Sequence, residues 1–226
     1  MPTCVITATN RGIGFELARV ALARGWTVFG SIRSMENAET CAAALGDGFL
    51  PLVFDVSDHA AVQQAAARIP EGIDLLINNA GVIGPERQTP FDMDFPGFQE
   101  TLAINTLAPL AVAQAFLPHL RRSGSGRILT VSSQMSWMGY RKSDTLAYRA
   151  SKAAVNKVMQ GLATELEPEG IPVVLVDPGW VRTDMGGPQA DNCPIEVAEG
   201  IFRIGEGLTL ADTGKFLRWT GEERPF

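Results

Sequence analysis

Short runs of apolar, mostly β-branched residues alternate along this 226-residue chain with longer stretches of helical periodicity. Within these short runs the apolar residues are not interleaved with polar ones, which predicts strands that are buried on both faces. Strand–helix alternation of this kind predicts a parallel sheet with right-handed crossovers and helices on both sides. We therefore expect one α/β domain over residues 1–226, a doubly wound parallel sheet.

The positions of the apolar runs give the expected elements. Strands are expected at residues 5–6, 27–29, 50–54, 75–77, 127–131, 171–176 and, as an edge strand, 215–219. Helices are expected at residues 15–22, 35–45, 60–69, 97–122 and 147–167. In such sheets ligands bind beyond the carboxyl ends of the strands, so the functional motifs should come directly after strands.

Composition narrows the function classes. The formal net charge of -6, without blocks of Lys or Arg, argues against nucleic acid or an anionic membrane as a partner. Three scattered cysteines and two isolated histidines argue against a disulfide framework and a metal site, and favour a cytoplasmic protein. The first residues lack the features of a signal peptide. The apolar stretch 107–120 is interrupted by prolines and polar residues, and is too short to span a bilayer.

A glycine-containing turn follows the first expected strand and leads into the first helix. It reads Thr7-Ala8-Thr9-Asn10-Arg11-Gly12-Ile13-Gly14. Glycines let the backbone approach a pyrophosphate closely, and the helix N-terminus supplies free N–H groups, as in a Rossmann-like fold. An ordinary strand–helix turn is the alternative. If the turn binds a dinucleotide, the expected contacts are Thr7, Asn10, Arg11, Gly12, Ile13 and Gly14.

The end of the second expected strand indicates which dinucleotide would bind. NAD sites place an Asp or Glu there for the ribose hydroxyls, whereas NADP sites tend to place Arg. Here the chain has Arg33, with no carboxylate before Glu36, and Arg11 lies in the turn itself. Two guanidinium groups could hold a 2′-phosphate, so NADP(H) is favoured over NAD(H). Two solvated surface arginines are the alternative.

Tyr148 and Lys152 stand at positions i and i+4 of the helix expected at 147–167, and therefore share one of its faces. A free tyrosine, with a pKa of about 10, is a slow acid near neutral pH, and a nearby ammonium group lowers that pKa. The preceding strand ends in Ser132-Ser133, which puts hydroxyls at the carboxyl edge of the sheet. This arrangement predicts a proton-transfer site.

Together these motifs resemble the short-chain dehydrogenase/reductase family across nearly the whole chain. The matching pieces, in family order, are the turn 7–14, Asp55-Val56, Asn78-Asn79-Ala80-Gly81, Asn105, Ser132-Ser133, Tyr148 with Lys152, and the run from Asp177 to Thr183. The sequence from Pro178 to Gly187 and the run Gly214 to Trp219 resemble the C-factor and carbonyl-reductase-like branch.

The resemblance implies a role for each matching residue. Tyr148 would exchange a proton with the substrate oxygen, Ser133 would hydrogen-bond that oxygen, and Lys152 would hold the nicotinamide ribose and lower the pKa of Tyr148. Asn105 would position a water molecule in a proton relay. The implied cofactor contacts, besides the turn, Arg33, Tyr148 and Lys152, are Asp55, Val56, Asn79, Ala80, Gly81, Pro178, Gly179, Val181 and Thr183.

The chain departs from the family pattern in three places. Ala8 stands where the first glycine of the turn is usual, and costs about 1 kcal/mol if its φ is positive. The spacing from Ser133 to Tyr148 is longer than usual, so Ser132 or Ser136 could supply the hydroxyl instead. Residues 180–204, which should cover the substrate, offer only a small lid.

Large apolar residues on loops flank the site and could line a pocket, plug the core or contact a subunit: Met135, Trp137, Met138, Tyr140, Trp180 and Met185.

These expectations describe an NADP(H)-dependent oxidoreductase that reduces a small or medium aldehyde or ketone. One alternative is an NAD-linked alcohol dehydrogenase. Another is a non-catalytic dinucleotide sensor or signalling protein, which the resemblance to C-factor keeps open.

The family also implies a homodimer or homotetramer built on the two long helices. An apolar face on residues 147–167 is compatible with such an interface, and consists of Val155, Val158, Met159 and Leu162.

Overall fold

A seven-stranded parallel sheet forms the centre of the computed structural model, which describes residues 1–226. Every neighbouring pair in this sheet is parallel, as the uninterrupted apolar runs predict. The spatial order is β3 (Phe49–Val53), β2 (Thr27–Ile32), β1 (Thr3–Ile6), β4 (Leu75–Asn78), β7 (Arg127–Val131), β8 (Val173–Asp177) and β9 (Phe216–Arg218). The predicted doubly wound, Rossmann-like fold is confirmed.

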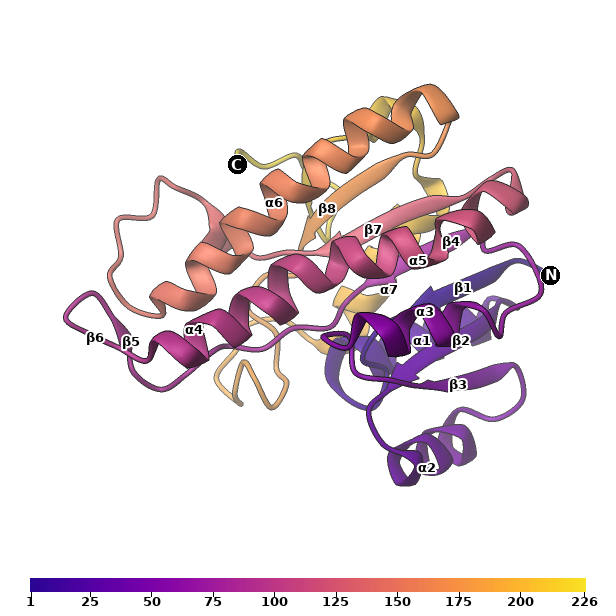
Figure 1. The fold of residues 1–226 in the computed structure, drawn as a ribbon, viewed down its shortest axis with the longest axis horizontal. Coiled ribbons are helices and arrows are strands. Elements are labelled where there is room, and N and C mark those ends of the chain that lie inside the picture. Colours follow the sequence, from indigo (N-terminus) through magenta and orange to yellow (C-terminus); the bar gives the residue numbers. More distant parts are fainter.

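Helices cover both faces of the sheet (Figure 1). One face carries α3 (His59–Ala66), α5 (Ala108–Ser123) and α6 (Leu146–Leu166). The opposite face carries α1 (Gly12–Ala23), α2 (Met35–Leu45) and α7 (Pro194–Gly207). Each layer encloses its own apolar core, and successive strand residues turn to opposite cores. In β1, Val5 packs under α3 and α5, whereas Cys4 and Ile6 pack under α1 and α7.

The helical stretch before β7 is longer than the sequence predicts. It runs without interruption from Phe95 to Ser123, through α4 (Phe95–Leu102), the π-helical turn η1 (Ala103–Leu107) and α5. By length and composition these residues could cross a membrane, but half of their most apolar window is buried inside the fold. Phe116 and Leu120 account for part of that burial, since both are fully enclosed in the core.

The helix α7 is not among the elements expected from the sequence, and it takes up part of the segment proposed as a lid. Residues 194–204 of the presumed lid 180–204 belong to α7, which packs closely against α1. The helix is hard to recognise in the sequence because three glycines interrupt its periodicity. Close packing accounts for two of them: a Cβ on Gly200 would lie 2.4 Å from the Trp219 carbonyl oxygen, and one on Gly205 would lie 2.8 Å from the Leu75 side chain. Only residues 180–193 remain as a loop beside the sheet edge.

The apolar face of α6 is also used differently from the prediction. Val155 and Met159 are completely buried in the core beneath the helix, so one sheet does require them. Val158 and Leu162 are half-buried and pack against the same core.

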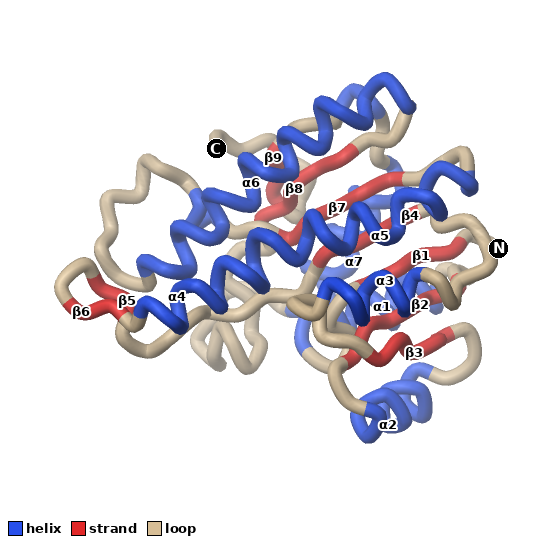
Figure 2. Tube along the Cα trace, viewed as in Figure 1, coloured by secondary structure: helices blue, strands red, loops and turns tan.

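Two loop regions extend beyond the sheet (Figure 2). One contains the small hairpin of β5 (Gln88–Thr89) and β6 (Asp92–Met93), and the other joins β7 to α6. Among the cysteines, Cys4 in β1 and Cys41 in α2 are buried, while Cys193, at the start of α7, is half-buried. None forms a disulfide.

Candidate active site

A single large pocket lies at the carboxyl edge of the sheet, where the topology predicts a ligand. Its walls are the segments that follow β1, β2, β3, β4, β7 and β8, together with side chains of η1 and α6. The predicted site residues that line it are Asn10, Arg11, Gly12, Ile13, Arg33, Asp55, Val56, Asn79, Ala80, Gly81, Tyr148, Lys152, Pro178 and Thr183. The predicted residues that do not line it are Thr7, Gly14, Asn105, Ser133, Gly179 and Val181.

The turn after β1 holds a left-handed residue where the family usually has glycine. Ala8 has a φ of 58°, so the conditional strain anticipated from the sequence is present. The turn is tied to the end of β2, because Ala8 N donates to Ser31 Oγ at 2.9 Å and Thr9 N donates to the Ser31 carbonyl at 3.0 Å. Gly12 also has a positive φ, of 56°.

Thr7 and Gly14 shape the turn from behind instead of facing the pocket. Thr7 Oγ1 accepts hydrogen bonds from the backbone N–H groups of Asn79 and Ala80, both at 2.9 Å. The side-chain amide of Asn79 donates to the Thr7 carbonyl, also at 2.9 Å. A Cβ on Gly14 would lie 2.1 Å from the Ala8 carbonyl oxygen, so only glycine fits there. The segments after β1 and β4 are thus fixed to each other.

The two arginines of the predicted phosphate site differ in their partners. Arg33 follows β2 directly, is exposed, and makes no ion pair. Its charge also acts on Asp55: burial works to raise the pKa of that carboxyl, but hydrogen bonds from Ser57 and the charge of Arg33 outweigh burial and lower it. Arg11 Nη1 lies 2.8 Å from Asp184 Oδ2, and both side chains are exposed.

Tyr148 and Lys152 are both buried on the first turns of α6. Lys152 Nζ donates to the Val131 carbonyl at 2.9 Å and lies 5.8 Å from the centre of the Tyr148 ring. Burial raises the pKa of Tyr148 to about 12, against the lowering effect of a hydrogen bond with Ser133, and the charge of Asp177 raises it further. Burial lowers the pKa of Lys152 to about 8. From the sequence, Lys152 was expected to lower the pKa of Tyr148. In the structure the net shift of that pKa is upward, because burial is the largest influence on both groups.

The three candidate serines have distinct partners. Ser132 Oγ donates to Asn156 Oδ1 at 2.5 Å, and Ser136 Oγ donates to the Ser133 carbonyl at 2.7 Å. Asn156 Nδ2 donates in turn to Ser136 Oγ at 2.9 Å. Ser133 Oγ accepts from Met135 N at 3.1 Å, and Ser133 is the serine that acts to lower the pKa of Tyr148.

Asn105 lies in the π-helical turn η1, and its side chain is committed to structure. Its Oδ1 accepts from Val82 N, and its Nδ2 donates to the Val82 carbonyl, both at 2.8 Å. Nδ2 also donates to Ser151 Oγ at 2.9 Å. Asn105 therefore fixes the segment after β4 against α6.

The segment after β8 forms the remaining wall. Pro178 and Thr183 line the pocket, whereas Gly179, with a φ of 71°, and the buried Val181 shape the bend between them. Ala8 in the turn, the alternative serine Ser132 and the loop residue Met185 also line the pocket. Several lining residues were missed from the sequence: Ser31, Ile32, Phe54, Val82, Ile104, Val131 and Asp184. Most directly adjoin predicted motifs at strand ends, and that adjacency was the one signal available for them.

The large apolar residues on the loops divide into several groups. Met185 lines the pocket, and Trp180 Nε1 donates to the Gly186 carbonyl at 2.7 Å, which holds the same loop. Trp137 and Tyr140 pack edge-to-face with ring centres 5.1 Å apart. Met138 is exposed.

Comparison with known proteins agrees with this geometry. The family model described as short chain dehydrogenase matches residues 2–194. The C-signal protein of Myxococcus xanthus is 41% identical over 155 residues, which cover 68% of this chain and 93% of that protein. The NADPH-bound carbonyl reductase from chicken fatty liver superposes with a TM-score of 0.91 at 30% identity, covering 100% of this chain and 99% of that one. Carbonyl reductase Sniffer of D. melanogaster has a TM-score of 0.93 at 27% identity, with both chains covered completely.

Motif order, sheet topology, pocket position and these similarities agree. The chain belongs to the short-chain dehydrogenase family, in the branch of C-factor and carbonyl reductases, and is an oxidoreductase acting on CH–OH or C=O groups with NAD(P).

Proposed function

We propose that this protein is an NADP(H)-dependent carbonyl reductase that converts a small or medium aldehyde or ketone to an alcohol, with Tyr148 as the proton donor. The observation that carries the proposal is that Tyr148 and Lys152 line the same pocket as the turn 10–13 and Arg33. One end of this pocket thus offers proton-transfer groups, and the other offers cations and helix N–H groups for phosphates.

The residues of the pocket fit a dinucleotide phosphate. The tight approach at Gly14 brings the N-terminus of α1 against the turn after β1, and no side chain caps the N–H groups of that helix end. Arg33 and Arg11 would hold the 2′-phosphate, Asp55 and Val56 the adenine, and Asn79, Ala80 and Gly81 the middle of the molecule. Pro178, Gly179, Val181, Thr183 and Lys152 would hold the nicotinamide side. When bound, this cofactor supplies the hydride.

Side chains of the protein then stabilise the negative charge on the substrate oxygen. Negative charge develops there as the carbonyl is reduced, and the Tyr148 hydroxyl donates its proton to that atom. Ser133 Oγ, beside Tyr148, donates a hydrogen bond to the same oxygen. Donors placed where charge develops stabilise the transition state more than the ground state. The buried ammonium of Lys152 favours the tyrosinate left after proton transfer.

The loop 180–193 would form the substrate side of the pocket. Met185 lines the pocket and Trp180 packs on the same loop, which suits an apolar carbonyl compound. The proposal extends to a cytoplasmic homodimer or homotetramer. The three free cysteines support the reducing compartment, and the half-buried Val158 and Leu162 on α6 are compatible with a subunit contact.

Cofactor titration tests the proposal first. Nicotinamide fluorescence is followed while NADPH or NADH is added to the wild type, to Arg33→Ser, and to Arg203→Ser, whose exposed arginine lies on α7 away from the pocket. We expect the wild type to bind NADPH more tightly than NADH. Loss of Arg33 should weaken NADPH binding by roughly tenfold to a hundredfold and leave NADH binding unchanged, since a charged hydrogen-bond partner of the 2′-phosphate is removed.

Each other outcome has a defined meaning. Tighter binding of NADH would make the protein an NAD-linked enzyme and overturn the assignment of Arg33. Absence of binding by either cofactor would favour a non-catalytic role, of the kind that the name of the M. xanthus relative suggests. An NADPH-coupled screen of apolar aldehydes and ketones then identifies the substrate.

A further inference from the structure

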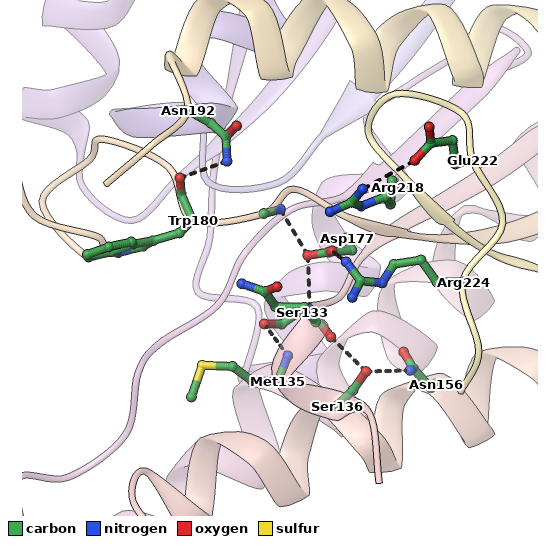
Figure 3. Close-up of polar contacts among 12 residues, drawn as sticks. Ser133, Met135, Ser136, Asn156, Asp177, Trp180, Asn192, Arg218, Glu222 and Arg224 are labelled. Atoms are coloured by element: carbon green, nitrogen blue, oxygen red, sulfur yellow. Dashed lines mark hydrogen bonds and ion pairs between the residues drawn. The ribbon is translucent and has the colours of Figure 1, made fainter. Parts of the chain in front are cut away.

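The carboxylate of Asp177 lies at the end of β8, almost completely buried between the two loops of the candidate active site (Figure 3). Its Oδ1 accepts hydrogen bonds from Gln134 N and from Gly179 N, each at 2.9 Å. Gln134 directly follows Ser133, and Gly179 directly follows Pro178. One carboxylate oxygen therefore fixes the residue beside the proposed oxyanion donor and the residue beside the pocket wall.

The other carboxylate oxygen is held from a distant part of the sequence. Asp177 Oδ2 forms an ion pair with Arg224 Nη1, and the Arg224 side chain is largely buried. Figure 3 shows the guanidinium of Arg224 reaching Asp177 from the segment that follows β9. The backbone carbonyl of Asp177 makes a second contact with this part of the chain, because it accepts a hydrogen bond from Trp219 N at 2.9 Å. The segment 219–226 is thereby attached to the active-site edge at two points.

Further contacts hold Arg224 in place. Its backbone N–H donates to the Phe216 carbonyl at 2.7 Å, and Arg218 N donates to the Glu222 carbonyl at the same distance, so the segment folds back along β9. The Phe226 ring stacks on Phe216 with ring centres 5.8 Å apart. The guanidinium is thus presented by an ordered support.

We propose that Asp177 and Arg224 are positioning residues for the reductase reaction. Their ion pair fixes the loops that carry Ser133 and Pro178, and makes the segment after β9 a part of the active site. This inference rests on the proposed function for its catalytic consequence, but not for the contacts themselves.

The physical argument starts from burial. A buried carboxylate costs several kcal/mol unless it is paired and hydrogen-bonded, and removing one partner of a buried pair is strongly unfavourable. Without Arg224 the buried carboxylate would be drawn toward water. That movement weakens the two bonds from Gln134 N and Gly179 N at once, because both end on the same oxygen.

The charge of Asp177 gives the pair a second effect. That charge raises the pKa of Tyr148, and the guanidinium of Arg224 lies against the same carboxylate. Loss of Arg224 would therefore leave the proton donor facing an uncompensated negative charge. Both effects impair the reaction without changing any group that touches the substrate.

The test compares Arg224→Met with Arg224→Lys and with Arg218→Met. Arg218 lies on β9 and pairs with Glu222 in an exposed contact, so it is the matched control. Amide hydrogen exchange is measured residue by residue, together with kcat and KM for NADPH-driven carbonyl reduction. In Arg224→Met we expect the amides of Gln134 and Gly179 to exchange at least about tenfold faster, while those of β8 stay protected.

We also expect Arg224→Met to lower kcat by roughly tenfold to a hundredfold, with much less change in KM, because misplacing groups by about 1 Å costs rates of that order. Arg224→Lys should restore part of kcat, and Arg218→Met should match the wild type. If Arg224→Met does not fold, the single variant Asp177→Asn gives the comparison, because its neutral amide breaks the ion pair with Arg224 and accepts more weakly from Gln134 N and Gly179 N. Its kcat should also fall.

Unchanged exchange at Gln134 and Gly179 would overturn the inference, whatever the turnover. Faster exchange with an unchanged kcat would overturn its catalytic part. If the wild type reduces no carbonyl compound, the proposed function fails, while the exchange measurement still decides whether the pair holds the two loops.

Discussion

Lys152 Nζ lies 5.8 Å from the centre of the Tyr148 ring, while its hydrogen bond goes to the Val131 carbonyl. The ammonium thus faces the ring of the proposed proton donor from a fixed position at the end of β7. Burial moves the two pKa values apart, to about 12 for Tyr148 and about 8 for Lys152. Between pH 6 and pH 7 both groups carry their protons, which is the state that carbonyl reduction requires.

Tyr148→Phe tests the proton donor. Removing the hydroxyl should lower the turnover number by roughly a hundredfold to ten-thousandfold, because a positioned general acid contributes about that much. NADPH affinity should stay within about twofold of the wild type. Steady-state reduction assays and fluorescence titration measure the two quantities.

Tyr140→Phe is the control for this variant, since Tyr140 is the second of two tyrosines and lies on a loop. It should behave as the wild type. Full turnover in Tyr148→Phe would remove the enzyme mechanism and leave a dinucleotide-binding protein.

The pH profile of kcat/KM tests the ammonium of Lys152. In the proposed reaction the free enzyme needs this group protonated, and burial lowers its pKa to about 8. We expect kcat/KM for reduction to be flat below about pH 7 and to fall about tenfold per pH unit above about pH 8. A profile that stays flat to pH 10 would contradict a role for the charge of Lys152.

The same lowered pKa affects stability. The unfolded chain binds this proton up to its ordinary pKa of 10.5, whereas the folded chain loses it near 8. The unfolded state therefore binds more protons between these values, so this group makes folding more favourable as the pH rises through that range. Tyr148 acts in the opposite direction between pH 10 and pH 12, because its pKa is raised on folding.

Ala8→Gly should stabilise the protein. Ala8 has a φ of 58°, which costs an alanine about 1 kcal/mol and a glycine almost nothing. We expect a gain of about 1 kcal/mol or less, and a melting temperature higher by roughly 2–4 °C. Ala43→Gly, at an exposed position inside α2, should have the opposite sign. A destabilising Ala8→Gly would mean that the turn does not keep this backbone conformation in solution.

Asp184→Asn tests the contact across the pocket edge. The carboxylate lines the pocket and pairs with Arg11, where it competes with phosphate for the guanidinium. Its removal should tighten NADPH binding by roughly twofold to fivefold at low salt, and less at high salt because both groups are exposed. Titrations at two ionic strengths measure this change. Weaker NADPH binding in Asp184→Asn would show that the carboxylate helps the loop to close over the cofactor.

The strands of the sheet and the Tyr148–Lys152 pair can be predicted from the sequence, because each depends on residues that are close together in the chain. Val5-Ile6 and Leu75-Leu76-Ile77 are uninterrupted apolar runs, and these belong to strands buried on both faces. Tyr148 and Lys152 are placed by helical spacing alone. Spacing alone leaves the hydroxyl beside Tyr148 open among three serines, and in the structure Ser132 Oγ and Ser136 Oγ both donate to other groups.

The features missed from the sequence depend on long-range contacts. Helix α7 is hard to recognise in the sequence because it contains glycines. Two of these glycines are required because Trp219 and Leu75 pack closely against the helix. Asp184 meets Arg11 across 173 positions of sequence, and Arg224 meets Asp177 across 47. The direction of the Tyr148 pKa shift was also missed, because the extent of burial follows from the packed fold and not from the Tyr–Lys spacing.

Because the three cysteines differ in burial, the protein can be labelled at a single thiol. Cys4 and Cys41 lie in the core, and burial raises the pKa of both thiols, so that reagents meet few thiolates there. Cys193 is partly accessible, and it directly follows Asn192, whose side chain donates to the Trp180 carbonyl at 2.9 Å. A fluorophore attached through a maleimide would therefore label the folded protein at one place, on the loop that borders the substrate side, without any engineered mutation.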